Sequence, residues 1–278
     1  MQVRHQIEHQ IISRRGILGG VLAAAAAVVQ PRAVPASELD AFLPRGQGKI
    51  DHHAFDVLLQ RFVKPDHARY NRVDYRAFGE NDRKELKGYI DALAAIDPAG
   101  LSRNEAYAYW INLYNAKTLD IVLEHYPVAS IREIDLGGGF FADGPWSKNV
   151  LRINGIDLSL DDIEHRIVRA QFKDPMSHYG LNCASYSCPN LAQAAYTGIS
   201  IDTALARTAT DYINHRRAID IRGRDIVASK LYSWYAEDFG GEAELKTHWQ
   251  SYASPSRAAA LEDADIRSYR YDWALNDV

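Results

Sequence analysis

The two cysteines of the chain lie in one short segment that also contains a histidine. The segment reads SHYGLNCASYSCPN, and its cysteines are Cys183 and Cys188. Such a pair allows three kinds of chemistry: a structural disulfide, part of a metal site, or a thiolate that attacks a substrate. Most of what the sequence indicates about function depends on which of the three applies.

Each of the three options can be weighed physically. A disulfide would close a very short loop, and the lost chain entropy of that loop is worth only about 2 kcal/mol. A metal site would have evenly spaced ligands at His178, Cys183 and Cys188, which is not a familiar zinc spacing. A nucleophile needs a base, a group that orients the base, and donors for an oxyanion. Disulfide and nucleophile both stay open, because a thiol pair can also oxidise reversibly.

Two asparagines upstream are candidates for such supporting roles. Asn112 and Asn115 lie three residues apart in the stretch YWINLYNAK, on a side of the expected helix that carries small residues. Amides buried on a tightly packed side must be hydrogen-bonded. They either tie down neighbouring backbone, or one of them orients a catalytic imidazole or helps to form an oxyanion site.

Glu164 and His165 form a second candidate pair, in the stretch DDIEHRI. An apolar stripe marks the core direction of this expected helix: Leu160, Ile163, Ile167 and Ala170. Glu164 falls about 60° from the centre of the stripe and His165 about 160° away. Adjacent helical residues do not share a face, so one site would include both only by wrapping around the helix edge. Taken alone, they indicate a salt-bridged glutamate and a surface histidine.

The elements that position these residues follow from periodicity and turn signals. Helices are expected over residues 53–63, 83–96, 102–127, 159–174, 202–215 and 242–252, with another around Trp234. Ser102 and Glu105 predict a capping box at the start of the longest helix. Hairpins are expected at 150–158, around Asn154-Gly155, and at 219–228, with a closing strand over 265–273. The sequence therefore predicts a mostly helical single α+β domain with short antiparallel strands.

The first 36 residues are expected to be an export signal and not part of the fold. Paired arginines, Arg14 and Arg15, precede an alanine-rich uncharged stretch that is too short to span a bilayer. Small residues before Ser37 suggest cleavage, and the pattern is typical of the twin-arginine type. An ordinary secretory signal or an uncleaved anchor is the alternative. We therefore expect a linker or arm over 37–49, a domain over 50–278, and a periplasmic or secreted protein without a stable membrane span.

Composition limits the class of partner. The 278 residues are 47% hydrophobic and carry a formal net charge of −4, which is globular and offers no basic footprint for nucleic acid. No motif for a cofactor or a metal ion is found. The remaining expectation is a small-molecule or peptide-like partner, with the oligomeric state left open.

Five ordered motifs resemble the DUF547 family, a domain of unknown function found in exported bacterial proteins and in plant proteins behind a leucine zipper. They are YWINLYNA, LSLDDIEHRIVR, DPMSHYGLNCASYSCPNL, ASKLYSWYAEDF and YRYDWALND, between about Ile50 and Asn276. No heptads are present, so the zipper role is not indicated. The family pattern singles out the residues already discussed, together with Pro189. It also includes residues that look like structural contacts: Ser229, Lys230, Trp234, Asp238 and Phe239.

This resemblance favours a thiol enzyme, because a polar set from distant segments is typical of an active site. Cys183 would be the nucleophile, His178 or His165 the base, and Glu164 or an asparagine the orienting group. The expected activity is a thiol-dependent hydrolase or acyltransferase on an amide or peptide-like substrate, with a possible papain- or transglutaminase-like fold. The alternative is a non-enzymatic module that binds a small thiol, a peptide or a partner protein, with a structural Cys183–Cys188 disulfide. A thiol-redox role is a third possibility.

Overall fold

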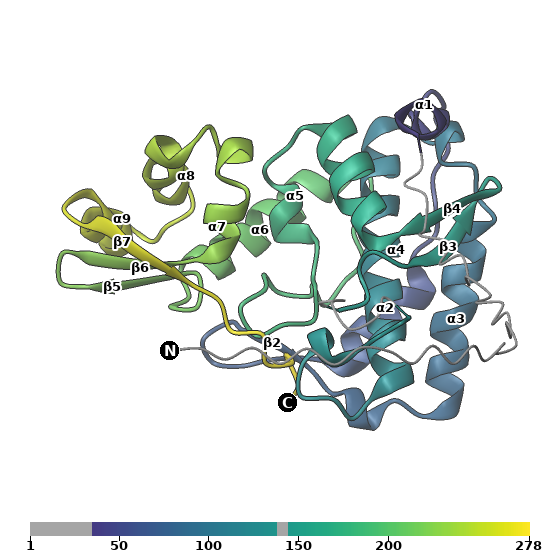
Figure 1. Ribbon diagram of the computed structural model, residues 1–278, viewed down its shortest axis with the longest axis horizontal. Coiled ribbons are helices and arrows are strands. Elements are labelled where there is room, and N and C mark those ends of the chain that lie inside the picture. The colour runs from purple at the N-terminus through teal and green to yellow at the C-terminus, as the bar shows by residue number, and fades with distance from the viewer. Residues whose placement is uncertain (1–34, 138–143) are drawn as a thin grey trace, which may run out of the picture. The chain divides into compact units, whose positions relative to one another are not determined.

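The computed structural model describes residues 35–137 and 144–278 (Figure 1). The expected export signal, apart from its last two residues, lies outside these described residues. The α-helices are α1 (Ala36–Leu39), α2 (His53–Phe62), α3 (Glu80–Ala94), α4 (Arg103–His125), α5 (Ser177–Gly180), α6 (Ile201–Ile213), α7 (Lys230–Trp234), α8 (Leu245–Gln250) and α9 (Pro255–Glu262). Short 3-10 turns are η1 (Asp40–Phe42), η2 (Tyr75–Ala77), η3 (Pro98–Gly100), η4 (Ile131–Glu133), η6 (Ala236–Phe239) and η7 (Glu242–Glu244). A wider π-type helix, η5, covers Asp162–Phe172.

In the described residues, seven short strands form three small sheets. They are β1 (Val63–Pro65), β2 (Asn71–Val73), β3 (Asn149–Ile153), β4 (Ile156–Ser159), β5 (Ile219–Arg222), β6 (Asp225–Ser229) and β7 (Asp265–Arg270). Strands β1 and β2, β3 and β4, and β5 and β6 pair antiparallel, and both expected hairpins are confirmed. The β3–β4 turn has positive φ angles at Asn154 and Gly155, as an Asn-Gly hairpin requires. The α+β class with short strands is therefore confirmed.

The closing strand departs from the expected antiparallel pattern. Strand β7 pairs with β6 in parallel, with Ile226 opposite Ile266 and Ala228 opposite Tyr269. Helices α7, α8 and α9 lie between the two strands in the chain, and such a long crossover is what a parallel pair needs. After β7 the chain continues to a C-terminus beside β2, where Val73 bridges Asp277 (Figure 1).

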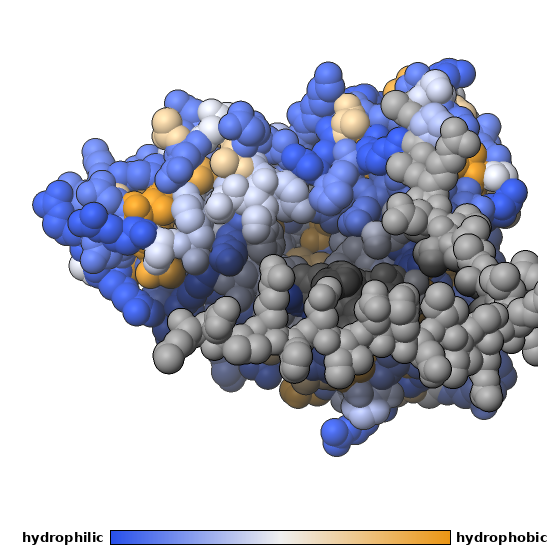
Figure 2. Space-filling view, viewed as in Figure 1, coloured by the Kyte–Doolittle hydropathy of each residue, from blue (hydrophilic) through white to orange (hydrophobic). Residues whose placement is uncertain are grey.

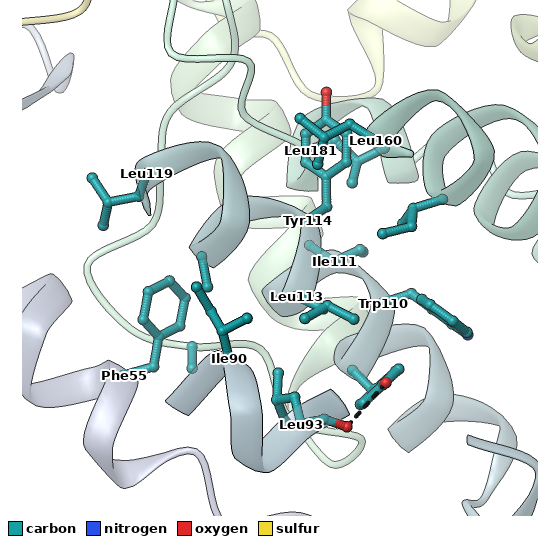
Figure 3. Close-up of a cluster of buried hydrophobic side chains, with 14 of the residues drawn as sticks. Phe55, Ile90, Leu93, Trp110, Ile111, Leu113, Tyr114, Leu119, Leu160 and Leu181 are labelled. Atoms are coloured by element: carbon teal, nitrogen blue, oxygen red, sulfur yellow. Dashed lines mark hydrogen bonds between the residues drawn. The ribbon is translucent and has the colours of Figure 1, made fainter. Parts of the chain in front are cut away.

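Two clusters of buried side chains lie side by side in the described chain. The larger cluster surrounds α4, whose apolar residues point in all directions, as its sequence predicts (Figure 3). Trp110, Ile111 and Leu113 are completely buried there, and each such side chain stabilises the fold by about 1.5–3 kcal/mol. The second cluster joins α6, β5, β6, α7, α8 and α9. The cysteine segment runs from one to the other, because Tyr179 belongs to the second cluster and Leu181 to the first.

The predicted capping box at the start of α4 is wrong. Ser102 is the N-cap residue, but its side chain makes no capping hydrogen bond. The Glu105 carboxylate instead accepts hydrogen bonds from the backbone N–H groups of Ile50, at 3.1 Å, and Gly198, at 2.8 Å. Because Glu105 is buried, these loop amides offer it partners that the first turn of its own helix does not. The carboxylate therefore fastens two distant loops to α4.

The visible face of the molecule is mainly hydrophilic, with small scattered groups of hydrophobic residues (Figure 2). Scattered exposed apolar residues are normal on a folded domain. Within the ranges 35–137 and 144–278, no helix combines the length and the apolar character that crossing a bilayer requires.

Candidate functional site

A cleft of about 270 Å³ opens beside the cysteine segment and is lined by residues from both hydrophobic clusters. Its lining includes Asp161, Glu164, His165, His178, Cys183 and Cys188, and an aromatic wall of Trp146, Trp234, Tyr235, Tyr271 and Trp273. Four of the six residues expected at a catalytic site therefore meet in one cavity. The other two, Asn112 and Asn115, are not part of its lining.

Cys183 is presented on a tight turn that follows α5. The next residue, Ala184, has a left-handed backbone with φ of 62°, which is strained for a residue with a Cβ atom. The side chain of Asn182 stabilises the turn, because its Oδ1 accepts a hydrogen bond from the Ala184 N–H at 3.0 Å. Strain of this kind, held in place by its surroundings, is common where a fold presents a functional side chain.

The C-terminal segment supplies the groups opposite this turn. The N–H of Asn276 donates to the carbonyl of Ala184 at 3.0 Å, and Ser185 forms an antiparallel bridge with Leu275. This pairing brings the Tyr271 hydroxyl to 3.3 Å from the Cys183 sulfur, and the Ser185 hydroxyl lies 3.1 Å from the same sulfur. Residues almost ninety positions apart in the sequence therefore surround one thiol.

The surroundings of Cys183 favour its thiolate. Hydrogen bonding with Cys188, and then with Ser185 and Tyr271, outweighs burial and lowers the pKa of Cys183 to about 7. Tyr271 itself stays protonated, because burial and the nearby thiols raise its pKa well above 10. Cys183 is half-buried and faces the cleft. A partly exposed thiol with a lowered pKa is the arrangement that reactive cysteines share.

Cys188 has the opposite character. Both cysteines are free thiols in the structure, but Cys188 is buried. Its sulfur accepts a hydrogen bond from the backbone N–H of Cys183 at 3.0 Å. Burial, and then the neighbouring Cys183, raise the pKa of Cys188 well above its usual value. The two thiols are adjacent but chemically unequal, and a Cys183–Cys188 disulfide stays a prediction.

His178 lines the cleft and is held by a carboxylate that does not itself line it. Its Nε2–H donates to Asp238 at 2.7 Å, and Arg169 donates to the same carboxylate from Nε, at 2.6 Å, and Nη2, at 3.0 Å. These donors, with His178 the strongest, hold the pKa of Asp238 well below its usual range. The ring also stacks on Tyr235, with centroids 4.1 Å apart. Within the described residues Nδ1 has no hydrogen-bond partner, so it is the nitrogen available for proton transfer.

Glu164 and His165 both reach the cleft because η5 is wound more widely than an α-helix. A π-type helix turns through fewer degrees per residue, so neighbouring side chains diverge less than we expected from α-helical geometry. Glu164 accepts a hydrogen bond from the Tyr235 hydroxyl at 2.7 Å, and among the described residues its only ion-pair contact is the loose one with His165. His165 lies 3.8 Å from Asp161 and 4.0 Å from Glu164, and its side chain is 37% exposed. This histidine is much less constrained than His178.

The side chains of Asn112 and Asn115 form hydrogen bonds with main-chain groups of other segments. Asn115 donates to the carbonyl of Gly180 and accepts from the N–H of Asn182, both at 2.8 Å. It thereby fixes the chain on either side of Leu181, just before Cys183. Asn112 makes the same pair of bonds to the backbone of Tyr196, at 2.8 and 3.0 Å, away from the cleft.

Sequence reasoning missed three residues of the site. Asp238 was expected to be a structural contact, yet it orients His178. Tyr271 and Ser185 were not singled out, although both contact the Cys183 sulfur. The available signal was their position inside the motifs YSWYAEDF, YRYDW and CASYSC. Within the described part of the chain, no group of three or more His, Cys, Asp or Glu side chains is arranged to hold a metal ion.

Comparison with known proteins gives one match. Residues 98–213 match the family model described as "Protein of unknown function, DUF547". No curated protein and no solved structure matches the chain significantly, so a papain- or transglutaminase-like fold stays a prediction. The matched range contains Glu164, His165, His178 and both cysteines, whereas Asp238 and Tyr271 follow it. Residues 98–213 of the chain therefore belong to the DUF547 family, a family of unknown function.

Proposed function

We propose that the chain is a thiol-dependent hydrolase or acyltransferase that acts on an amide or peptide-like substrate through Cys183. The observation that carries the proposal is the Cys183 thiol, with a pKa of about 7, in a cleft that is also lined by His178, whose imidazole is bonded to Asp238. Thiolate, imidazole and orienting carboxylate are the three groups that covalent acyl transfer needs. Their order along the chain is immaterial, because such sets are defined by geometry.

In the proposed reaction, the Cys183 thiolate attacks the carbonyl carbon of the substrate and forms a thioester. His178 Nδ1 takes the proton of the Cys183 thiol and gives it to the leaving amine as the C–N bond breaks. It later takes a proton from the water or acyl acceptor that attacks the thioester, and the Cys183 sulfur leaves. Asp238 holds the imidazole by its other nitrogen and stabilises the imidazolium that forms. The Tyr271 hydroxyl, already at the sulfur, is a donor for charge that develops on the substrate oxygen.

The shape of the cleft supports a substrate with a compact apolar group. The rings of Tyr271 and Trp273 are 4.6 Å apart and those of Trp234 and Tyr271 4.8 Å apart, so they form a continuous aromatic wall. Asp161 and Glu164 add carboxylates to the lining of the cleft. A cleft of about 270 Å³ is at the small end of ligand sites and suits one side chain or acyl group of a substrate.

An activated ester tests the proposal without knowledge of the natural substrate. The full chain is mixed with 4-nitrophenyl acetate, nitrophenolate release is followed, and the quenched protein is digested and analysed by mass spectrometry. We expect a burst and an acetyl thioester on Cys183, and neither in Cys183→Ala. Acylation that persists in that variant, or that is found only on another residue, would contradict the proposal.

The aromatic wall also favours the alternative role, a non-enzymatic binding module for a small thiol, a peptide or a partner protein. In that case Cys183 and Cys188 would form a stable bridge. Intact mass with and without mild reductant separates the two roles, because a bridge that resists reduction leaves no nucleophile. Export to the periplasm or the exterior remains part of the proposal on the strength of residues 1–36 alone.

A further inference from the structure

We infer that Cys183 and Cys188 form a dithiol redox pair, in which Cys183 attacks a small-molecule disulfide and Cys188 resolves the resulting mixed disulfide. The exchange itself does not depend on the proposed acyl transfer. Only one consequence, that oxidation switches off acyl transfer at Cys183, rests on the proposed function.

The geometry separates the two roles. Both cysteines line the cleft, but Cys183 is half-buried, where a dissolved disulfide can reach it, whereas Cys188 is only 4% exposed. The backbone N–H of Cys183 donates to the Cys188 sulfur at 3.0 Å. The Cys188 thiol itself donates to the carbonyl of Leu181 at 3.6 Å. The resolving sulfur is therefore already next to its target.

The surrounding contacts keep Cys188 in this position. The buried guanidinium of Arg217 donates from Nε to the Cys188 carbonyl at 3.2 Å and from Nη2 to Asn190 at 2.7 Å. Asn182, next to Cys183, donates to the carbonyl of Pro189 at 2.7 Å. Both ends of the loop that a disulfide would close are thus bonded to fixed groups.

The charges favour this order of events. Before the reaction, the neighbouring Cys183 is one of the causes that raise the pKa of Cys188. Once Cys183 is a neutral mixed disulfide, its charge no longer opposes ionisation of Cys188. Burial still raises the pKa of Cys188, but the second thiol ionises more readily once the first has reacted, which is what a resolving thiol needs.

The two steps balance without any other reactant. The Cys183 thiolate attacks one sulfur of RS–SR, a Cys183–SR bond forms, the RS–SR bond breaks, and RS⁻ leaves with the electron pair. Cys188 then gives its proton to that RS⁻, its sulfur attacks the Cys183 sulfur, and a second RS⁻ leaves. The protein loses two electrons, which reduce the disulfide to RSH and RS⁻.

Oxidised glutathione is a suitable probe for the reduced full chain. Samples are quenched by acid and alkylation at successive times and analysed by intact and peptide mass. For the natural chain we expect brief glutathionylation of Cys183, then a Cys183–Cys188 bridge that dithiothreitol reverses. Cys188→Ser should accumulate the mixed disulfide at Cys183, and Cys183→Ser should react at least tenfold more slowly. Thermal unfolding of each variant verifies that it is folded.

Two results would overturn the inference. One is a natural chain that stays glutathionylated as long as folded Cys188→Ser does, because Cys188 would then not resolve. The other is a chain in which iodoacetamide modifies Cys183 but oxidised glutathione forms neither adduct nor bridge. If the bridge forms but the reduced protein gives no burst with 4-nitrophenyl acetate, the redox pair is supported and only the proposed acyl transfer is contradicted. A burst that continues in the bridged protein would remove the proposed switch.

Discussion

Two sets of buried polar side chains, one on α4 and one at the cleft, differ in how their hydrogen-bonding capacity is used. Asn112 and Asn115 each give one donor and one acceptor to a single stretch of backbone, at 2.8–3.0 Å. At the cleft, His178 uses one nitrogen and keeps the other, and Cys183 faces an open cavity. The comparison teaches that a buried polar side chain indicates function only where one of its donors or acceptors has no partner in the fold. A side chain whose hydrogen bonds are all made within the fold stabilises the structure.

The largest effect that this comparison predicts is on Cys183. Cys183→Ala should abolish the burst with 4-nitrophenyl acetate, a loss on the order of 10⁴-fold or more, because no other group replaces the nucleophile. Stability should change little, since the side chain is only half-buried. Asn112→Ala is the counterpart on α4 and should lose stability instead. Equal loss of activity in folded Asn112→Ala would break the distinction.

The next effect concerns the carboxylate behind His178. Asp238→Asn removes the negative charge that fixes the imidazole and stabilises the imidazolium, so turnover should fall on the order of 10³-fold. Asp225→Asn is the matched control, because this carboxylate pairs with Arg267 on the surface. Steady-state rates for both variants provide the test. If the two variants lose the same small amount of activity, Asp238 is a structural contact, as the sequence had suggested.

A smaller effect, and on stability, is expected from Asn115. Asn115→Ala leaves the Gly180 carbonyl and the Asn182 N–H without partners in a buried place, which should lower the free energy of unfolding by about 3 kcal/mol. Denaturant unfolding measures this. Asn104→Ala is a control on the exposed face of the same helix and should lie within about 0.5 kcal/mol of the natural chain. A stable Asn115→Ala with lost acylation would instead assign Asn115 to the chemistry.

The smallest effect concerns the pH dependence of Cys183. Its lowered pKa predicts that the rate of iodoacetamide labelling rises through about pH 7, because only the thiolate reacts. Tyr271→Phe removes one donor to the thiolate and should move the midpoint upward by roughly one pH unit or less. Tyr269→Phe, on β7, is the control. A midpoint that stays near the ordinary thiol value in the natural chain would contradict the proposed activation.

The secondary structure was largely predictable because its signals are local. Asn154-Gly155 fixed a hairpin, and the spacing of apolar residues fixed the long buried helix. Two local predictions failed. In one, a tertiary contact gave a side chain a different hydrogen-bond partner, and in the other the helix has a different geometry from the expected α-helix. Glu105 bonds distant loop amides instead of capping its own helix, and η5 is a π-type helix that brings Glu164 and His165 to one cavity.

The sequence by itself determined the fold class, the family and the cysteine segment as the centre of interest, because these follow from local patterns and ordered motifs. Only the tertiary structure decided which polar groups meet. Pairing of the C-terminal segment with the turn at Ala184 brings Tyr271 to Cys183, and the packing of α5 against η6 joins His178 to Asp238. Hydrogen bonds between residues sixty to ninety positions apart leave no periodic trace in a sequence. Their energies depend on distances that exist only once the chain has folded.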